Sequence, residues 1–232
     1  MNPNDYDAMA LAYSVDNEQN AWNALYERPA ILGLASDVNG LRVLDAGCGA
    51  GAHAVALVER GANVSGFDLS EQLLAIARQR LGGQVPLVQA DLNAALPYPD
   101  GQFDLVLSAL VMHYVEDWAI PLGEFARILR KGGRLVFSTH HPFMDHVLAK
   151  GENYFATYAF KESWERGGQQ VTMQFWHRPL SAMLQSLTRA GFSVERIDEP
   201  MPLESAREEF PDAYRTLTTS PRFIFFSART IE

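Results

Sequence analysis

Residues 43–51 read Val43-Leu44-Asp45-Ala46-Gly47-Cys48-Gly49-Ala50-Gly51, so an apolar run leads directly into a glycine-rich turn. Glycine permits positive φ angles and carries no side chain, which lets a ligand approach the backbone of the turn. Residues 52–60 then have a helical pattern that ends at Gly61. This order of strand, turn and helix predicts an α/β domain that binds a nucleoside at the end of its first strand.

Single acidic residues follow the next two apolar runs. Asp68 comes after residues 63–67, and Asp91 comes after residues 86–90. Because the carboxyl ends of parallel strands share one edge of a sheet, Asp68 is placed to accept hydrogen bonds from ribose hydroxyls. Asp91 is placed to accept one from an adenine amino group, while the Leu92 amide can donate to a ring nitrogen. Simpler interpretations stay open, since Asp68 also suits a helix N-terminus and Asp91 suits an ordinary turn.

The glycine spacing separates two classes of cofactor. Gly47, Gly49 and Gly51 follow G-x-G-x-G, whereas dinucleotide-binding proteins use G-x-G-x-x-G. A nicotinamide-dependent oxidoreductase is therefore the weaker alternative, and it would leave Asp91 without a role. Asp45 lies two residues before the first glycine. It is placed to attract a cationic or amino-bearing ligand, although it could simply cap the turn.

The composition limits the class of protein and of partner. A chain of 232 residues with 47% hydrophobic residues suits one α/β domain with a sizeable core. No run approaches the roughly 20 apolar residues of a membrane span, and the polar start is unlike a signal peptide. The net charge of -9 repels nucleic-acid phosphates, and the single cysteine, Cys48, fits a reducing compartment. We therefore expect a cytoplasmic protein with a small-molecule partner and no nucleic-acid or membrane partner.

Strand and helix patterns alternate along most of the chain, as expected for a parallel sheet that is buried on both faces. Residues 142–178 differ, because they are rich in aromatic residues with little regular period, and residues 199–221 read as a loop with a short helical piece. Long segments of this kind inside a compact domain are usually functional. The expected strands are 41–45, 63–67, 86–90, 103–107, 134–138, 192–197 and 223–228, and the expected helices are 17–35 with a kink or new start at Pro29, 52–60, 70–81, 120–129 and 181–190.

Five segments of the core form a series. In chain order they are Val43–Gly51, Gly66-Phe67-Asp68-Leu69-Ser70, Gln89-Ala90-Asp91-Leu92, Phe103-Asp104-Leu105-Val106-Leu107-Ser108 and Leu129-Arg130-Lys131-Gly132-Gly133-Arg134. Each is modest by itself, but the five in this order resemble the class I S-adenosylmethionine-dependent methyltransferases of the small-molecule, type 11-like branch. The resemblance is dense over about residues 40–140. The N-terminal Tyr6-Asp7-Ala8-Met9-Ala10, with Tyr13, also resembles the lid of that branch.

The resemblance implies a fold and a cofactor. The fold is a Rossmann-like, seven-stranded, mostly parallel sheet with helices on both faces, whose antiparallel last strand is Phe223-Ile224-Phe225-Phe226. Residues 1–232 would form a single methyltransferase domain, with an N-terminal helical lid at 1–36 and a cofactor-binding core at 40–140. Substrate-cap insertions would lie at 142–178 and 199–221. The cofactor would be S-adenosyl-L-methionine, with S-adenosyl-L-homocysteine as product.

Carried over to matching positions, the resemblance also implies a cofactor site. The glycines would lie under the methionine part, the two acids after the strands would hold the ribose and the adenine amino group, and residues 108–110 would line the sulfonium. Tyr13 and His113 would close over the cofactor. The expected cofactor-binding residues are Tyr13, Asp45, Gly47, Gly49, Asp68, Leu69, Asp91, Leu92, Ser108, Ala109 and His113.

Two adjacent histidines, His140 and His141, follow the fifth expected strand. Histidine titrates near neutral pH, so either is a candidate catalytic residue that accepts a proton from a hydroxyl or amine acceptor. The alternative is one pocket-lining histidine and one structural histidine. Their spacing with Asp145 and His146 matches no metal-binding pattern, so we expect no metal site. His177 could also point into the pocket.

The sequence leaves the acceptor open. An oxygen, a nitrogen or a carbon atom of a small molecule could receive the methyl group. A non-catalytic adenosyl-binding module also remains an alternative, because methyl transfer needs no signature nucleophile. Aminopropyl transfer is less favoured, since no acid-rich polyamine site follows the fourth strand. The oligomeric state is not readable.

Overall fold

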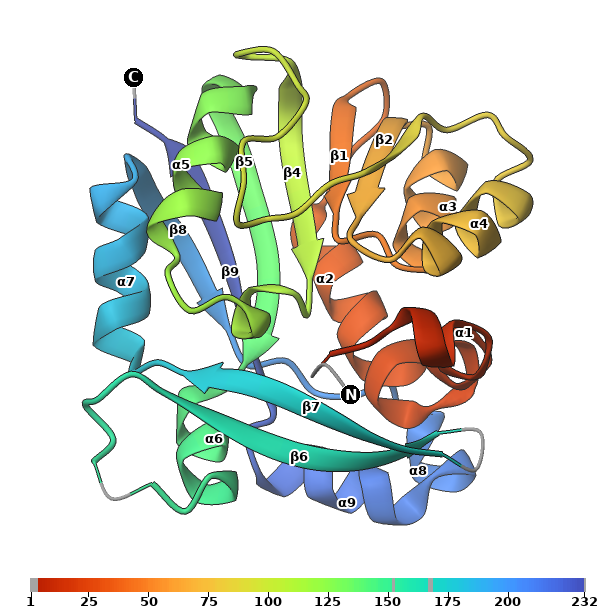
Figure 1. Cartoon of the computed structure of the whole chain (residues 1–232), viewed down its shortest axis with the longest axis vertical. Helices are drawn as coiled ribbons and strands as arrows, with labels where there is room; N and C mark the ends of the chain where they lie inside the picture. The colour runs from red at the N-terminus through yellow and green to blue at the C-terminus, as the bar shows by residue number, and fades with distance from the viewer. Residues whose placement is uncertain (1–3, 152, 167–168, 232) are drawn as a thin grey trace.

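The computed structural model of the chain describes residues 4–151, 153–166 and 169–231, without the side chains of residues 166 and 169. Residues 1–3 of the expected lid and residues 152, 167 and 168 of the expected cap lie outside the described residues, as does residue 232. In Figure 1, a large twisted sheet stands above a separate two-stranded hairpin. Within the described ranges, no helix combines the length and the apolar character needed to cross a bilayer.

Seven strands form the main sheet in the order β3-β2-β1-β4-β5-β9-β8. Neighbours from β3 to β5 pair in parallel, whereas β9 is antiparallel to both β5 and β8. The prediction of a mostly parallel sheet with an antiparallel last strand is confirmed. The strands are β1 (Arg42–Ala46), β2 (Asn63–Asp68), β3 (Leu87–Gln89), β4 (Phe103–Ala109), β5 (Leu129–His140), β8 (Phe192–Asp198) and β9 (Phe223–Thr230).

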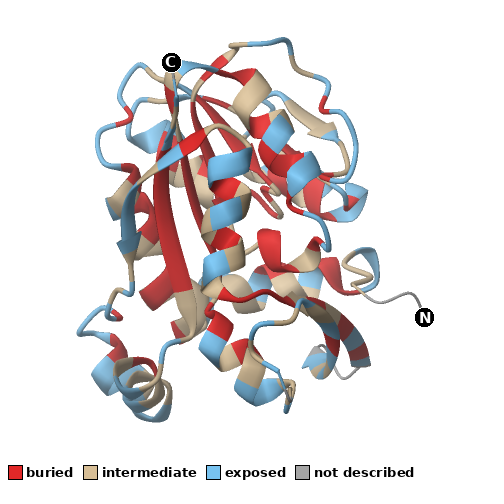
Figure 2. Cartoon of the chain, turned by 90° about the vertical axis from the view of Figure 1, so that its left-hand side faces the viewer, coloured by how far each residue is buried: buried red, intermediate tan, exposed pale blue. Residues whose placement is uncertain are grey.

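Alternate residues of the central strands supply two hydrophobic cores. Val43 belongs to one buried cluster and its neighbour Leu44 to the other, because successive side chains of a strand point to opposite faces. Figure 2 shows these strands as a mostly buried layer among the helices. One core packs under α5 (Ala119–Ile128) and α7 (Leu180–Arg189). The other packs under α2 (Arg28–Ala35), α3 (Ala52–Glu59) and α9 (Pro211–Thr219). Helix α4 (Glu71–Arg80) contacts β2 and β3.

The fifth strand is longer than its sequence predicts. We expected a helix to Leu129 and a strand from Arg134, but α5 ends at Ile128 and β5 begins at once with Leu129. Gly132 adopts a φ of +66°, and the register between β4 and β5 shifts in this region. The glycines therefore form an irregularity inside the strand, as at a β-bulge, rather than a loop before it.

The N-terminal region is more broken than the expected helix at 17–35. Residues Asp7–Met9 form the 3-10 helix η1, and α1 spans Ala10–Gln19. A π-helical turn, η2, covers Asn23–Glu27 and passes directly into α2, which has Pro29 in its first turn. Proline offers no N–H to the preceding turn, which explains why the wide turn lies just before it.

The segment at 142–178 is regular in three dimensions. Helix α6 covers Pro142–Leu148, and β6 (Tyr158–Arg166) pairs antiparallel with β7 (Gln169–His177). Val171, Met173 and Phe175 alternate along β7 and are buried in a cluster with Met9 and Phe160. Figure 1 shows that the hairpin lies across the carboxyl ends of the parallel strands. The short helices η3 (Met112–Tyr114) and α8 (Ala206–Glu209) complete the chain.

Candidate active site

The glycine turn after β1 is fixed against the neighbouring strand. The N–H groups of Gly47 and Cys48 both donate to the Phe67 carbonyl, each at 2.9 Å. Gly47 has a φ of +74°, and a Cβ added there would lie 2.5 Å from a methyl carbon of Val111. Glycine is therefore required at this position by both backbone conformation and space.

Asp68 is held at the end of β2 by two backbone donors. One carboxylate oxygen accepts the Gly49 N–H at 2.8 Å, and the other accepts the Ser70 N–H at 2.9 Å. Burial raises the pKa of Asp68, while these hydrogen bonds act in the opposite direction. Asp68 thus braces both the glycine turn and Ser70, whose own hydroxyl caps α4 by accepting the Leu73 N–H. The remaining lone pairs of Asp68 are free to accept ligand hydroxyls.

A cavity of about 310 Å³ lies over this edge of the sheet. Asp91 lines it, although one Asp91 oxygen also accepts the Asn93 N–H at 2.8 Å, so the expected turn is present as well. Gly49 borders open space, because a Cβ added there would meet no atom within 4 Å. Of the predicted cofactor residues, the cavity is lined by Tyr13, Gly47, Gly49, Asp68, Leu69, Asp91, Leu92 and Ala109.

Three predicted cofactor residues lie elsewhere. Asp45 is 1% exposed beneath the turn, where burial raises the pKa of its carboxyl to about 6. Ser108 is 0% exposed, and among the described residues its hydroxyl has no hydrogen-bond partner. His113 lines a second cavity instead of the first. The reason is strand geometry: Asp45 and Ser108 point into the interior, and η3 carries His113 past the cofactor edge.

The second cavity, of about 440 Å³, adjoins the first. Four residues, Tyr6, Tyr13, Leu110 and Tyr114, line both cavities. Its further lining residues lie in or beside α1, η2, η3, the end of β5, α6, the β6–β7 hairpin and the start of β9; they are Asp16, Asn20, Trp22, Asn23, His113, His140, Met144, Asp145, Leu148, Glu162, Trp164, Arg222 and Phe223. The expected lid and the expected cap at 142–178 thus form much of the wall of this cavity, and residues outside both, among them His113, His140 and Arg222, form the rest.

His140 enters the second cavity with a defined orientation. Its Nδ1 lies 3.0 Å from a carboxylate oxygen of Asp145, which is 2% exposed. The His113 ring stacks on His140 with centroids 3.7 Å apart, and burial and His140 lower the pKa of His113 well below its usual value. A neutral His140 ring with its hydrogen on Nδ1 donates to the Asp145 carboxylate and keeps a lone pair on Nε2.

His141 has a different setting. Its Nδ1 accepts the Phe143 N–H at 3.3 Å as the cap of α6, and its Nε2 lies 2.8 Å from Glu199. His141 is not among the residues that line either cavity. Burial is the main cause of the lowered pKa of His141. The expected pair is therefore divided into one cavity residue and one helix cap.

Leu110 joins the two cavities in a strained conformation that the sequence did not indicate. It has a φ of 53°, and its N–H donates to the hydroxyl and to the carbonyl of Ser138, at 3.0 and 3.1 Å. The Ser138 hydroxyl donates to Glu27 at 2.7 Å, and the other Glu27 oxygen lies 2.9 Å from His53 Nε2. A non-glycine residue with positive φ persists only where its surroundings hold it.

Tyr6, Tyr114 and Asp145 were also missed as site residues. The hydroxyls of Tyr6 and Tyr114 are hydrogen-bonded to each other across the junction of the cavities. Burial raises the pKa of Tyr6 and of Tyr114, so both hydroxyls stay protonated.

His177, which the sequence suggested could point into the pocket, lies outside the second cavity, and its Nε2 is 2.8 Å from the Tyr154 carbonyl oxygen. Among the described residues, no group of three or more His, Cys, Asp or Glu is placed to hold a metal ion.

Comparison with known proteins identifies the family. A methyltransferase-domain family model matches residues 44–137. A demethylmenaquinone methyltransferase from Clavibacter sepedonicus is 37% identical over 229 residues, covering 86% of this chain and 91% of the relative. An S-adenosylmethionine-dependent methyltransferase from Mesorhizobium loti is 30% identical, with a TM-score of 0.71 over 92% of this chain and 99% of the other. The chain belongs to the S-adenosylmethionine-dependent methyltransferases.

A further structure supports the methyltransferase fold. A protein from Listeria monocytogenes described as an S-adenosylmethionine-dependent methyltransferase is 26% identical, with a TM-score of 0.76 over 89% of this chain and 97% of the other. The cofactor of this methyltransferase is S-adenosylmethionine, and the 310 Å³ cavity has the groups to hold it. The Asp68 carboxylate suits ribose hydroxyls, apolar Leu69 and Leu92 suit the faces of adenine, and open space at Gly49 suits close backbone approach.

Proposed function

We propose that this methyltransferase transfers the methyl group of S-adenosylmethionine to a small molecule held in the second cavity. The observation that carries this proposal is the junction of the two cavities at Tyr6, Tyr13, Leu110 and Tyr114. One side of the junction has the acidic and glycine residues that suit an adenosyl ligand. The other side has an oriented histidine and room for an acceptor.

In the proposed site, Gly47, Gly49, Asp68 and Asp91 hold the cofactor, which supplies a methyl group on a sulfonium when bound. The protein has to position the acceptor in line and to exclude water, and positioning of this kind can contribute roughly 7–11 kcal/mol. The centroids of the Tyr6 and Tyr13 rings are 4.9 Å apart at the junction. Aromatic rings attract a cation by about 0.5–2 kcal/mol each, which favours the sulfonium at this point.

His140 acts as the general base of the proposed reaction. Asp145 keeps the proton on Nδ1, so Nε2 can accept a proton from an acceptor hydroxyl or amine. This assignment favours an oxygen or nitrogen acceptor, since those atoms lose a proton on methylation. His141 has a structural role in the proposal, because it caps α6.

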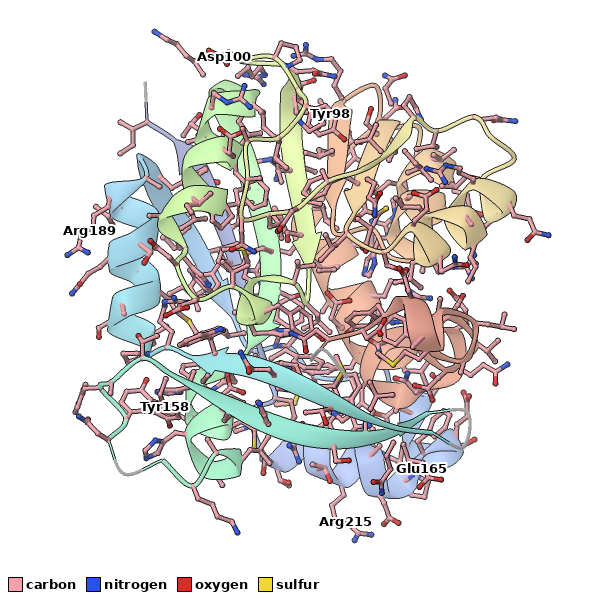
Figure 3. The ribbon with its side chains drawn as sticks, in the orientation of Figure 1. Tyr98, Asp100, Tyr158, Glu165, Arg189 and Arg215 are labelled. Carbon is pink, nitrogen blue, oxygen red and sulfur yellow. The ribbon has the colours of Figure 1, made fainter. Side chains whose placement is uncertain are left out.

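The surrounding segments fit a lid and one cap around a core. We assign the lid to residues 1–36, the cofactor-binding core to residues 40–140, and the cap to residues 142–178. The other expected cap, residues 199–221, lines neither cavity, and its helix α9 packs on the hydrophobic core instead. Figure 3 shows Tyr158 on the hairpin, where its hydroxyl lies 3.0 Å from His146 of α6 and ties the parts of the cap at 142–178 together. The free, buried Cys48 favours a reducing compartment, which supports a cytoplasmic location.

Calorimetric titration with S-adenosylhomocysteine tests the cofactor half of the proposal. The wild-type chain should bind, and Asp68→Ala should lose about 1.5–3 kcal/mol of binding free energy through a charge-assisted hydrogen bond. The matched control is Asp100→Ala, because Asp100 lies at the opposite end of the sheet (Figure 3) and should not affect binding. Wild-type protein that fails to bind S-adenosylhomocysteine at saturating concentration would disprove the proposal.

A further inference from the structure

Arg222 occupies a fixed position on the wall of the second cavity. It directly precedes β9 and lines the cavity beside Phe223. Its backbone carbonyl accepts the His141 N–H at 2.9 Å, which anchors it to the end of β5. Its guanidinium carbon lies 5.2 Å from the centroid of the Trp22 ring. Stacking on an aromatic face holds a guanidinium in one plane and leaves its edge available for hydrogen bonds.

The guanidinium of Arg222 is not satisfied by the protein. Its Nε is buried and has no hydrogen-bond partner in the described part of the chain. Nor does any described carboxylate form an ion pair with it. A buried donor without a partner costs free energy, so an acceptor atom supplied by a ligand in this cavity would stabilise the guanidinium.

The acidic residues of the same cavity have partners. Asp145 is bonded to His140, Glu162 accepts the Trp164 Nε1–H at 3.3 Å, and Asp16 accepts from the Asn20 side chain at 3.1 Å. Among the described charged residues that line this cavity, Arg222 is therefore the one whose side chain has no hydrogen-bond partner. A planar fork of N–H donors fits a carboxylate better than any neutral group.

We propose that the methyl acceptor carries a carboxylate that binds Arg222. The acceptor is then a small hydroxy- or amino-carboxylic acid, held at one end by the guanidinium with its nucleophile directed toward His140 and the cavity junction. Trp22 and Phe223, which line the cavity beside Arg222, favour an acid with a flat ring. This inference rests on the proposed function, since it identifies the substrate class of the same site.

Titration of the complex with S-adenosylhomocysteine tests the inference. The probes are 4-hydroxybenzoate, its neutral analogue 4-hydroxybenzamide and the cationic amine tyramine. We expect 4-hydroxybenzoate to bind about tenfold or more tightly than the other two, because only its carboxylate can form charge-assisted bonds with the guanidinium. Arg222→Gln should remove this preference, and Arg222→Lys should keep part of it, because lysine retains the charge without the fork.

Two controls separate this inference from the proposed function. Arg215→Gln changes an exposed arginine on α9, away from the cavity (Figure 3), and should keep the preference for the acid. S-adenosylhomocysteine should bind equally to the wild type and to Arg222→Gln. If it does not bind the wild type, the proposed function fails. If it binds but the amine or the amide binds as well as the acid, or no acid binding is measurable at millimolar concentration, only the carboxylate inference is overturned.

Discussion

The two cavities meet at four residues but are built in different ways. The 310 Å³ cavity, which we assign to the cofactor and call the cofactor cavity, is lined mostly by residues between Gly47 and Val115. These residues lie at the ends of four adjacent parallel strands. The 440 Å³ cavity, which we propose for the acceptor and call the acceptor cavity, takes its lining from Tyr6 to Phe223. That lining includes residues of the N-terminal region and of the segment at 142–178, both outside the main sheet. The family model, which matches residues 44–137, ends before His140. The family's shared sequence pattern thus covers most residues of the cofactor cavity. The acceptor cavity instead forms where segments that are far apart in the sequence come together.

The largest effect should come from the acceptor cavity. His140→Ala should lower turnover about 10²–10⁴-fold, which is the usual contribution of a general base, and should leave the affinity for S-adenosylhomocysteine unchanged. The assay follows release of S-adenosylhomocysteine with any acceptor that the wild type uses. His141→Ala is the matched control, because its ring caps α6 outside the cavity, and it should keep most of the turnover. Equal losses in both variants would contradict the division of the pair.

A change in the glycine turn should affect the cofactor cavity instead. Gly47→Ala places a Cβ 2.5 Å from a Val111 methyl carbon at a φ of +74°. The positive φ alone costs roughly 1–2 kcal/mol, so we expect about tenfold or greater loss of S-adenosylhomocysteine affinity by calorimetry.

Two further variants test the cause. Adding Val111→Ala removes the clash and should restore part of the affinity. Gly123→Ala lies in α5, where an added Cβ meets no atom within 4 Å, and it should leave binding intact. Wild-type affinity in Gly47→Ala would show that the turn adapts.

The junction between the cavities should respond to a buried serine. Ser138→Ala removes the hydroxyl that bonds Leu110 and Glu27, leaving a buried carboxylate oxygen short of a donor. Unfolding in urea should show a loss of about 1–3 kcal/mol. Ser108→Ala is the matched control on the adjacent strand, since its buried hydroxyl has no partner among the described residues, and it should be neutral or stabilising. Equal destabilisation by both would mean that the hydrogen bonds at Ser138 do not hold Leu110.

The smallest effect should come from the far end of the sheet and should not distinguish the cavities. Asp104 bonds Arg42 and Arg130, and these hydrogen bonds hold the pKa of its carboxyl well below the ordinary value. Its stabilisation is therefore present above the unfolded-state pKa of about 3.9 and is lost as the pH falls toward the folded-state pKa. Asp104→Asn should cost about 1 kcal/mol at pH 7, because both arginines are half exposed.

Urea unfolding at pH 7 and at pH 3 measures this prediction. The difference between the wild type and Asp104→Asn should shrink in acid, and the affinity for S-adenosylhomocysteine should stay the same in both proteins at pH 7. A difference that grows as the pH falls would contradict the assigned direction of the pKa shift.

The parallel half of the sheet was largely predictable, because its signals are local. Apolar runs define β1, β2 and β4, and the residue just past a strand lies at its carboxyl edge wherever the rest of the chain goes. Ser108 shows the limit of this reasoning. It is adjacent to Ala109, which lines the cavity, but it points into the core because side chains alternate along a strand.

The acceptor half could be predicted only in part. The alternation of Val171, Met173 and Phe175 was a strand signal inside a segment that otherwise showed little period. Helix η3 carries His113 into the acceptor cavity, and no spacing indicates that its ring stacks on His140. Asp145 lies five residues after His140 and becomes its partner because α6 starts immediately after β5.

The sequence by itself determined the main sheet, the glycine turn and the acids at the carboxyl ends of β2 and β3, since each strand and the residues at its end form within one short stretch of chain. Tertiary structure alone decided which of two adjacent histidines faces the cavity and how Glu27 and Ser138 hold Leu110. It also decided that Arg222 lies beside Trp22 with no counter-ion among the residues that the structure describes. These features depend on contacts between residues that are far apart in the sequence. The free energy of such a contact depends on the removal of water from both partners on burial, and a local sequence pattern does not show which residues will be buried together.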